Sequence, residues 1–404
     1  MTATTVTDRR RLKMFRAAWL FDDTGGTLMP DPVIVVDGAK IISVQQGGAP
    51  AAGADLVDLA GATLLPGLID THVHLAFDAS RDPVGHLAAR TDPEALTAMA
   101  EAGRAALRGG VTTVRDLGDR NYLSLGLRDS SHLPTIAAAG PPITTPGGHC
   151  HYLGGVADGG VAGVRAAVRQ HAERGVDVIK IMASGGTLTP GTRQERSQFT
   201  VEELRAAVEE AHRLGLPITA HAHGTQAIRD AVTAGVDGME HVTFWSEEGV
   251  DEPGELIELI AARRITVGAT IGIAPIPGEM PPPAVTIRMP RIAANHRRLY
   301  QGGAPMVAGT DAGIAPVKPP DVLRHALPQL IEQGMVPAEA LRAITSAAAA
   351  VCGLAHRKGR IAAGFDADLL AVDGDPFTDP DAIHRIRAVY RNGSPVPGVG
   401  AHAA

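Results

Sequence analysis

From residue 68 onward, short apolar runs alternate with longer stretches of helical periodicity. The eight runs are residues 68–75, 112–117, 135–143, 178–183, 217–223, 238–242, 265–271 and 305–312. Continuous apolar runs of this length are typical of strands buried on both faces, as in a parallel sheet covered by helices. Eight strand–helix units in succession predict an α/β protein folded as a (β/α)8 TIM barrel.

Local signals mark where helices between these runs begin and end. Thr200 is followed three residues later by Glu203, the pattern of a capping box, in which each side chain satisfies a free backbone N–H. The helical stretch 161–174 is followed by Gly175, a residue that readily takes the left-handed conformation that ends a helix. Both signals agree with helices placed between the strands.

The two ends of the sequence have a different character. Short β-type runs at 33–36, 39–44, 367–372 and 386–390 adjoin turn signals such as Asp37-Gly38 and Asn392-Gly393. No helical stretch follows them. We expect the two ends to pair into one small β-sandwich domain, built from residues 1–65 and 355–404, beside a barrel at residues 66–354.

Composition excludes several classes of function. The formal net charge of −7 argues against a nucleic-acid partner, and we interpret the basic cluster at residues 9–13 as a solvated segment. Cys150 and Cys352 are the two cysteines, so the sequence indicates no disulfide framework and fits a reducing cytoplasm. No apolar run reaches the roughly 18 residues of a membrane span. We therefore expect a cytoplasmic protein that acts on a small molecule.

Residue types that bind metal ions stand on five of the eight runs. They are His72 and His74 in the first, Lys180 in the fourth, His221 and His223 in the fifth, His241 in the sixth and Asp311 in the eighth. Side chains two residues apart on a strand point to the same face. Barrel enzymes carry their catalytic groups where the C-terminal ends of the strands meet. Imidazole and carboxylate groups are common ligands of divalent cations, so the layout predicts a metal site.

Lys180 is unusual because it lies in the middle of an apolar run. Burial disfavours the charged form of a lysine and lowers its pKa. The neutral amine can react with CO2 to form a carbamate, an anionic ligand with two oxygens that is able to bridge two metal ions. The alternative is a lysine that pairs with a buried carboxylate or extends to the surface.

These residues and their neighbours resemble the amidohydrolase superfamily, in its binuclear branch with a carboxylated lysine. The matching segments are residues 66–74, 177–181, 221–224, 240–241, 309–311 and 364–370, so the resemblance covers nearly the whole chain. The segments 146–149 and 184–186 are similar to those of Xaa-Pro dipeptidases, acyl-amino-acid carboxypeptidases and imidazolonepropionase-related amidohydrolases.

The resemblance implies a role for each ligand. It assigns a buried metal ion to His72, His74 and Asp311, a more exposed ion to His221 and His241, and a bridging carbamate to Lys180. His223 shares the face of His221 and is either a substrate-facing or a structural residue. Asp70 is either a supporting group behind His72 or a buried, hydrogen-bonded carboxylate. The ligand set suits two Zn²⁺ ions best, although Mn, Co, Fe or Ni would fit the same donors.

Such a site implies hydrolysis of an amide-like C–N bond by a metal-bridging hydroxide that attacks the carbonyl carbon. Asp311 would take the proton and pass it to the leaving nitrogen. His149, in the loop after the third strand, would hydrogen-bond the developing oxyanion, with Tyr152 and His151 as weaker candidates in the same loop. Arg193, after the fourth strand, would clamp a substrate carboxylate or remain a solvated loop charge.

The sequence leaves the scissile bond open. A dipeptide, an N-acyl amino acid or a carbamate is the leading substrate class, and a cyclic amide or a xenobiotic ester or amide is the alternative. A remote alternative is a non-catalytic barrel that serves as an assembly module, but such proteins lose the ligands that this chain keeps. The Pro-rich loop 275–283 would be a lid. An exposed apolar face on the barrel helices would be compatible with a homo-oligomer.

Overall fold

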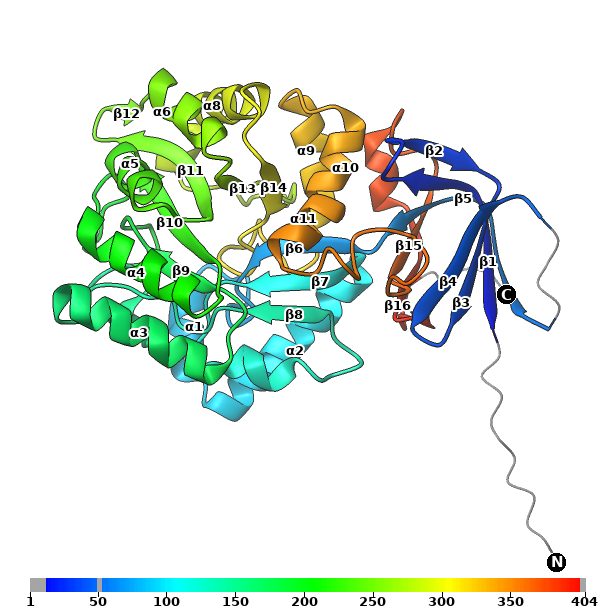
Figure 1. Cartoon of the computed structure of the whole chain (residues 1–404), viewed down its shortest axis with the longest axis horizontal. Helices are drawn as coiled ribbons and strands as arrows, with labels where there is room; N and C mark the ends of the chain where they lie inside the picture. Colours follow the sequence, from blue (N-terminus) through cyan, green and yellow to red (C-terminus); the bar gives the residue numbers. More distant parts are fainter. Residues whose placement is uncertain (1–11, 49–52, 400–404) are drawn as a thin grey trace, which may run out of the picture.

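The computed structural model of the chain describes residues 12–48 and 53–399. Strands and helices of the long middle region lie on one side, and a sheet built from both ends of the chain lies on the other (Figure 1). Residues 9–11 of the basic cluster lie outside the described residues. Among the described residues, no helix is both long enough and apolar enough to cross a lipid bilayer.

The middle region contains a strand at each of the eight expected places. They are β6 (Leu68–Val73), β7 (Val111–Asp116), β8 (Thr135–Ala138), β9 (Ile179–Met182), β10 (Ile218–Gly224), β11 (Gly238–Ser246), β13 (Thr266–Thr270) and β14 (Met306–Gly309). The first three form one parallel sheet and the other five a second, in which the short strand β12 (Gly249–Val250) adds an antiparallel hairpin to β11. Isolated parallel bridges, Ile143–Ile181 and Val73–Ala312, connect the two sheets.

One predicted strand is shorter than expected. Residues 135–143 were expected to form one run, whereas β8 ends at Ala138. Pro141 and Pro142 follow, and proline has no N–H with which to continue a ladder. The chain returns to the sheet only at Ile143, whose N–H donates to the carbonyl oxygen of Lys180 at 2.8 Å.

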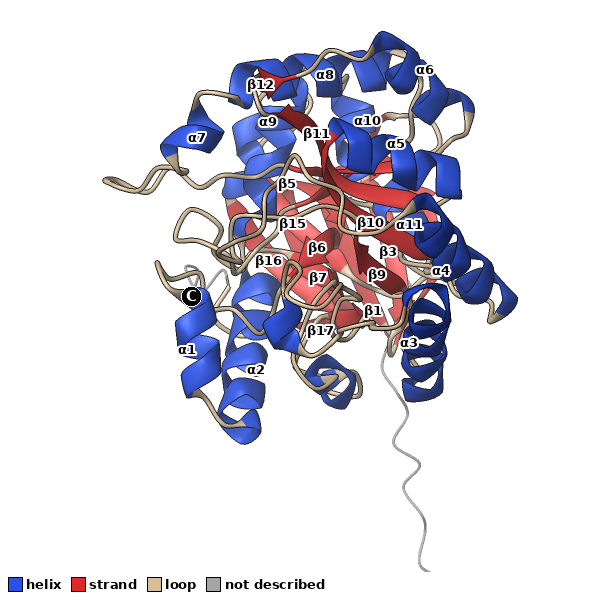
Figure 2. Ribbon diagram, turned by 90° about the vertical axis from the view of Figure 1, so that its left-hand side faces the viewer, coloured by secondary structure: helices blue, strands red, loops and turns tan. Residues whose placement is uncertain are grey.

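Helices surround the strands of the middle region (Figure 2). They are α1 (Pro83–Ala89), α2 (Asp92–Arg108), α3 (Gly160–Arg174), α4 (Val201–Arg213), α5 (Thr225–Ala234), α6 (Gly254–Ala262), α7 (Pro283–Thr286), α8 (Met289–Gln301), α9 (Ala326–Glu332), α10 (Pro337–Ala343) and α11 (Ser346–Val351), with 3-10 turns at Leu123–Leu127, His151–Leu153, Val322–His325 and Pro380–His384. The capping box is confirmed, because the Thr200 N–H donates to the Glu203 carboxylate at 2.8 Å and the Glu203 N–H donates back to the Thr200 hydroxyl. Gly175 ends α3 at a φ of 79°.

The two ends of the chain form one eight-stranded sheet. Its strands are β1 (Lys13–Asp22), β2 (Thr27–Pro30), β3 (Pro32–Asp37), β4 (Lys40–Gln46), β5 (Asp55–Pro66), β15 (Leu369–Asp373), β16 (Ile386–Arg391) and β17 (Ser394–Pro395). The order is β17-β16-β15-β5-β1-β3-β4, with β2 beside β1. The pairing of both chain ends agrees with expectation. The domain boundaries at residues 65 and 355 stay a prediction.

The strands that were expected to form a small β-sandwich share one hydrogen-bonded sheet. The long strand β5 pairs in parallel with β1 and antiparallel with β15, so it joins both sets of strands into a single ladder. The sheet then curls until Lys40, on the far strand β4, bridges to Asp366, just before β15. Phe15, Ile34 and Leu64 are among the buried side chains that fill the inside of the curl.

Candidate metal centre

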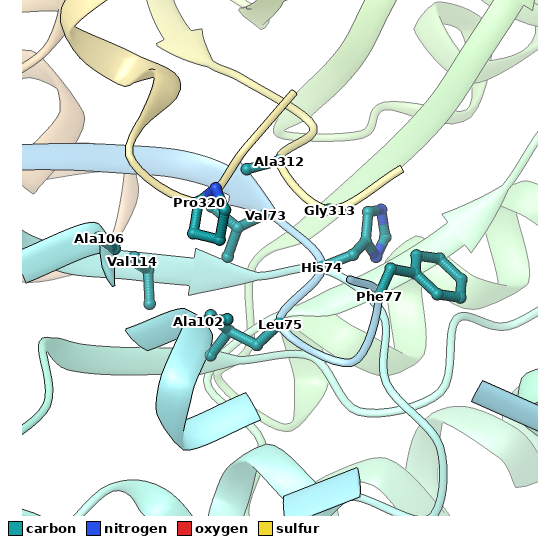
Figure 3. Close-up of a pocket in the computed structure, with 10 residues that line it drawn as sticks. All are labelled: Val73, His74, Leu75, Phe77, Ala102, Ala106, Val114, Ala312, Gly313 and Pro320. Carbon is teal, nitrogen blue, oxygen red and sulfur yellow. The ribbon is translucent and has the colours of Figure 1, made fainter. Parts of the chain in front are cut away.

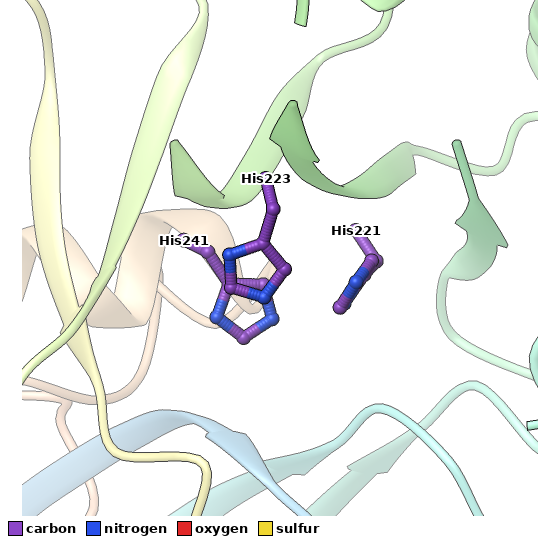
Figure 4. A group of neighbouring side chains, drawn as sticks. All are labelled: His221, His223 and His241. Atoms are coloured by element: carbon purple, nitrogen blue, oxygen red, sulfur yellow. The ribbon is translucent and has the colours of Figure 1, made fainter. Parts of the chain in front are cut away.

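Two groups of three side chains that could hold a metal ion lie at the C-terminal ends of the parallel strands. One consists of His72, His74 and Asp311, and the other of His221, His223 and His241 (Figure 4). Within each group, one ligand atom of every residue lies within 4.8 Å of the others. Six of the predicted site residues are therefore brought together. They come from β6 and the residue that follows it, from β10 and β11, and from the segment after β14.

In the first group, both imidazoles approach the same carboxylate oxygen. His72 Nε2 lies 3.4 Å and His74 Nε2 3.2 Å from Asp311 Oδ1. His74 Nδ1 lies 3.0 Å from the carbonyl oxygen of Gly118, which only accepts, so Nδ1 carries the proton and Nε2 is free to bind a metal. His74 also lines a small, mostly apolar pocket together with Phe77 and Val114 (Figure 3).

Asp311 is ionised in this setting. Although burial alone would raise the pKa of Asp311, the neighbouring His72 and His74 hold that pKa far below its usual range. Its backbone has a φ of 61°, and His241 of the second group has a φ of 74°. Non-glycine residues rarely adopt such values, and strained backbone of this kind clusters at functional sites.

The second group keeps one nitrogen of each ring engaged and the other free. His221 Nε2 lies 3.1 Å from the carbonyl oxygen of Gly185, so Nδ1 is its free nitrogen. His223 Nδ1 donates to the hydroxyl of Thr243 at 2.9 Å, and that hydroxyl donates onward to the carbonyl of His223. The rings of His223 and His241 stack with centroids 4.2 Å apart. Burial lowers the pKa of all three imidazoles, to about 3 for His223, so they are neutral and able to bind a cation.

Lys180, on β9, interacts electrostatically with both groups. Its side chain is fully buried, and Nζ has no hydrogen-bond partner among the described residues. Burial lowers the pKa of Lys180 to about 8, and its charge interacts with Asp311 and His72 of the first group and with His221 of the second. A buried amine without a partner is costly unless something else satisfies it. A carbamate on Nζ, held by two cations, would do so, and the donor set of the two groups suits divalent cations.

His149 lies beside the second group. Its ring centroid is 4.7 Å from that of His221, and Nδ1 is hydrogen-bonded to the Thr189 hydroxyl at 3.0 Å. Burial lowers the pKa of His149 to about 4, so the ring is neutral. Gly186 leaves room for it, because a Cβ at that position would lie 2.3 Å from His149 Nε2.

The three other substrate candidates differ in burial and in their partners. Tyr152 is half-buried, its hydroxyl is 3.7 Å from the Cys150 sulfur, and burial raises its pKa. Arg193 is more than half exposed and pairs with Glu195 and Glu247. The structure does not bring Arg193 to the metal-binding side chains, because these carboxylates satisfy its charge at the surface. His151 is exposed.

Asp70 is a buried carboxylate that ties two strand ends together. It accepts hydrogen bonds from the backbone N–H of His72 at 3.2 Å and from the N–H and hydroxyl of Thr310 at 3.0 and 2.6 Å. Burial raises the pKa of Asp70 to about 6. Of the two interpretations of Asp70, the hydrogen-bonded carboxylate describes its contacts, since it touches the backbone of His72 and not the ring.

Sequence reasoning missed three buried charges near the site. Glu240 Oε2 lies 3.3 Å from His72 Nδ1, and Glu240 Oε1 lies 2.7 Å from Nη2 of Arg115. Burial would raise the pKa of Glu240, but Arg115 and His72 outweigh it and hold that pKa at about 2. Lys318 is buried and donates to the carbonyl of Thr270 at 3.3 Å. The available signal was a charged residue inside an apolar strand, which applies to Arg115 and Glu240 as it did to Lys180.

Comparison with known proteins identifies the family of the chain. Strand-end histidines with an aspartate are typical of hydrolases that use divalent cations. Residues 63–396 match the model of the Amidohydrolase family, and the chain belongs to that family. It is 31% identical over 366 residues to ochratoxinase of Aspergillus niger, covering 81% of this chain and 73% of that protein.

Two further relatives span more of the chain. Imidazolonepropionase of Deinococcus deserti is 28% identical over 394 residues, covering 88% of this chain and 87% of that protein. The crystal structure of a Xaa-Pro dipeptidase with bound methionine in the active site is 28% identical, with a TM-score of 0.83, and covers 95% of this chain and 99% of that one. Family membership supports a hydrolase that acts on amide bonds.

Proposed function

We propose that the chain is a binuclear metal-dependent hydrolase that cleaves an amide-like C–N bond in a dipeptide, an N-acyl amino acid or a carbamate. The observation that carries this proposal is Lys180, whose buried Nζ makes no hydrogen bond among the described residues and whose charge interacts with both groups of candidate ligands. We also infer that the eight parallel strands close into a (β/α)8 barrel, because bridges connect the two sheets at both of their edges.

In this proposal His72, His74 and Asp311 hold one cation and His221 and His241 the other, with the carbamate of Lys180 shared. His223, whose Nε2 is free, either faces the substrate or takes part in the second site. Bound divalent cations, Zn²⁺ in this proposal, would supply a Lewis acid for the scissile carbonyl and an activated water.

Proton transfer and stabilisation of the developing negative charge are assigned to two side chains of the protein. Asp311 is the base that accepts the proton of the attacking water and delivers it to the leaving nitrogen, since an amine leaves poorly without that proton. His149 is neutral and close to the second group, so it is suited to donate a hydrogen bond to the oxygen on which charge develops.

The substrate class rests on the relatives. The likeness to a Xaa-Pro dipeptidase covers nearly the whole of both chains and favours an acyclic substrate with a peptide-like bond. The likeness to imidazolonepropionase supports a cyclic amide as the second candidate. Of the two interpretations of Arg193, its pairing with Glu195 and Glu247 supports the loop charge over a clamp for a substrate carboxylate.

The test is a screen of Zn²⁺-loaded and Mn²⁺-loaded protein against dipeptides, N-acyl amino acids, carbamates and cyclic amides, together with metal analysis. We expect about two metal ions per chain and turnover within one of the first three classes. Turnover of cyclic amides alone would favour the second candidate. Less than about one metal ion per chain under metal-replete conditions would refute the proposal and favour the assembly-module alternative.

A further inference from the structure

His72 and Glu240 each carry one buried side-chain atom that makes no hydrogen bond within the described residues, and these two atoms face each other. His72 Nδ1 lies 3.3 Å from Glu240 Oε2, and each side chain is 1% exposed. The opposite ring nitrogen, Nε2, lies 3.4 Å from Asp311 Oδ1. A ring nitrogen binds a metal ion only without its proton, so His72 can use Nε2 only if Nδ1 carries the proton.

The other oxygen of Glu240 is fully engaged. Oε1 accepts one hydrogen bond from Arg115 at 2.7 Å and another from the Thr219 hydroxyl at 2.8 Å, which leaves Oε2 directed at His72. Arg115 also donates through Nε to the carbonyl oxygen of Thr71 at 2.6 Å. The Arg115 guanidinium therefore holds both the Glu240 carboxylate, which faces His72, and the peptide bond between Thr71 and His72.

The Glu240 carboxylate fits beside β13 because residue 268 is a glycine. Gly268, on β13, is paired in register with Glu240 on β11, and a Cβ at Gly268 would lie 2.1 Å from Glu240 Oε2. Any side chain at that position would push the carboxylate away from the ring. Strands β6, β7, β11 and β13 thus all contribute to one contact with His72. A salt bridge that served stability alone would not need its second oxygen directed at a metal-binding ring.

We propose that Glu240 is a positioning residue for His72, which accepts the hydrogen bond of Nδ1–H and thereby keeps Nε2 free for a metal ion, with Arg115 holding the carboxylate in place. The inference rests on the proposed function, because it assigns a task to His72 as a metal ligand. It adds a residue to the site that lies outside both groups of ligands.

The decisive variant is Glu240→Gln. The amide keeps an oxygen for Arg115 and Thr219 but presents an NH2 group to His72, so Nδ1 must accept and the proton moves to Nε2. We expect affinity for Zn²⁺, measured by competition with a chromophoric chelator, to fall about 10–100-fold. In the metal-free protein, the ¹⁵N resonance of His72 Nδ1 should change from the protonated to the unprotonated range. The matched control is Thr219→Val, which removes a hydrogen bond to Oε1 alone and should keep the wild-type tautomer.

Two results would overturn the inference: unchanged Zn²⁺ affinity in folded Glu240→Gln, or a proton on Nε2 of His72 in the metal-free wild type. The position of the proton on His72 is measured in the wild type, so this test applies even if Glu240→Gln does not fold. Gly268→Ala keeps every charge but displaces the carboxylate, and should also weaken Zn²⁺ binding. A wild type that binds no Zn²⁺ refutes the proposed function itself, whereas a wild type and a Glu240→Gln variant that bind Zn²⁺ equally refute only this inference.

Discussion

The rings of His72 and His241 have centroids 5.3 Å apart, although one belongs to β6 and the other to β11. This contact joins the two groups of metal-binding side chains into one continuous cluster. His74 adjoins His72 at 5.2 Å, and His221 adjoins His241 at 4.6 Å. Changes at one group are therefore expected to affect the other, and the predictions below are chosen to separate the roles of individual residues.

Asp311→Asn should lower kcat/KM by about 10³-fold or more while the protein stays folded, because the amide cannot take a proton from the attacking water. Steady-state kinetics measure kcat/KM, and circular dichroism with a thermal melt checks that the protein is folded. The neighbouring imidazoles keep Asp311 ionised in the wild type. Activity comparable to wild type in this variant would show that another group moves the proton.

Lys180→Ala should lose bound metal and activity together, because the bridging carbamate can no longer form. A short carboxylic acid such as acetate or propionate should restore part of both, since it places a two-oxygen ligand in the space that the side chain vacates. Metal content per chain and turnover are measured with and without the acid. Chloride at equal ionic strength is the control, and full metal occupancy without any acid would contradict the bridging role.

Reactivation of metal-stripped protein should depend on pH with a definite sign. The pKa of Lys180 is lowered to about 8, and only the neutral amine reacts with CO2. At a fixed dissolved CO2 concentration, the rate of reactivation by added Zn²⁺ should rise about tenfold per pH unit up to pH 8 and level off above it. To measure this rate, reactivation is stopped at a series of times and the activity of each sample is assayed at one common pH. A rate independent of both pH and CO2 would argue against carboxylation.

His149→Ala should lower kcat/KM by about 100-fold with metal content unchanged, because it removes a hydrogen-bond donor near the second group. The matched control is His151→Ala in the same loop, whose side chain is exposed and should tolerate the change. Equal kinetics for the two variants would remove His149 from the reaction. Loss of metal in His149→Ala would instead assign it a ligand role.

A stability prediction concerns the sheet built from both chain ends. Lys358 is buried and pairs with Asp366 at 3.0 Å and Asp368 at 2.6 Å, whereas Lys40 is half exposed and pairs with the same Asp366 at 2.8 Å. Lys358→Met removes the closest cation of the buried Asp368, whereas Asp366 keeps Lys40 and Arg357, and should lower the free energy of unfolding by about 3–5 kcal/mol. Lys40→Met should lower it by less than about 1 kcal/mol. Urea unfolding of both variants compares them, and equal losses would contradict the assignment of Lys358 as a buried partner.

Local patterns account for what could be predicted. Strand and helix positions follow from short-range periodicity, and Thr200 and Gly175 act on residues within one turn, so both helix signals agree with the structure. The ligand residues could be grouped because the C-terminal ends of parallel strands meet at one face. That rule brought His72 and Asp311 together without knowledge of any distance.

Long-range pairing accounts for what could not be predicted. Arg115 and Glu240 are 125 residues apart, and nothing near either residue names its partner. Arg193 had two interpretations, which depended on whether Glu247, on the β11–β12 hairpin, reached it. The choice between one curled sheet and two packed sheets depended on whether β5 pairs with strands from both ends of the chain, which strand propensity does not specify.

The position of β5 also bears on synthesis of the chain. Its residues Ala62–Pro66 pair with β15, which begins only at Leu369. At about 5–20 residues per second, a ribosome needs roughly 15–60 s to make the intervening segment of about 300 residues. Until then this edge of β5 presents unpaired N–H and C=O groups, which other strands can use as a template. Neighbouring nascent chains on one messenger RNA therefore compete with β15 for the same edge.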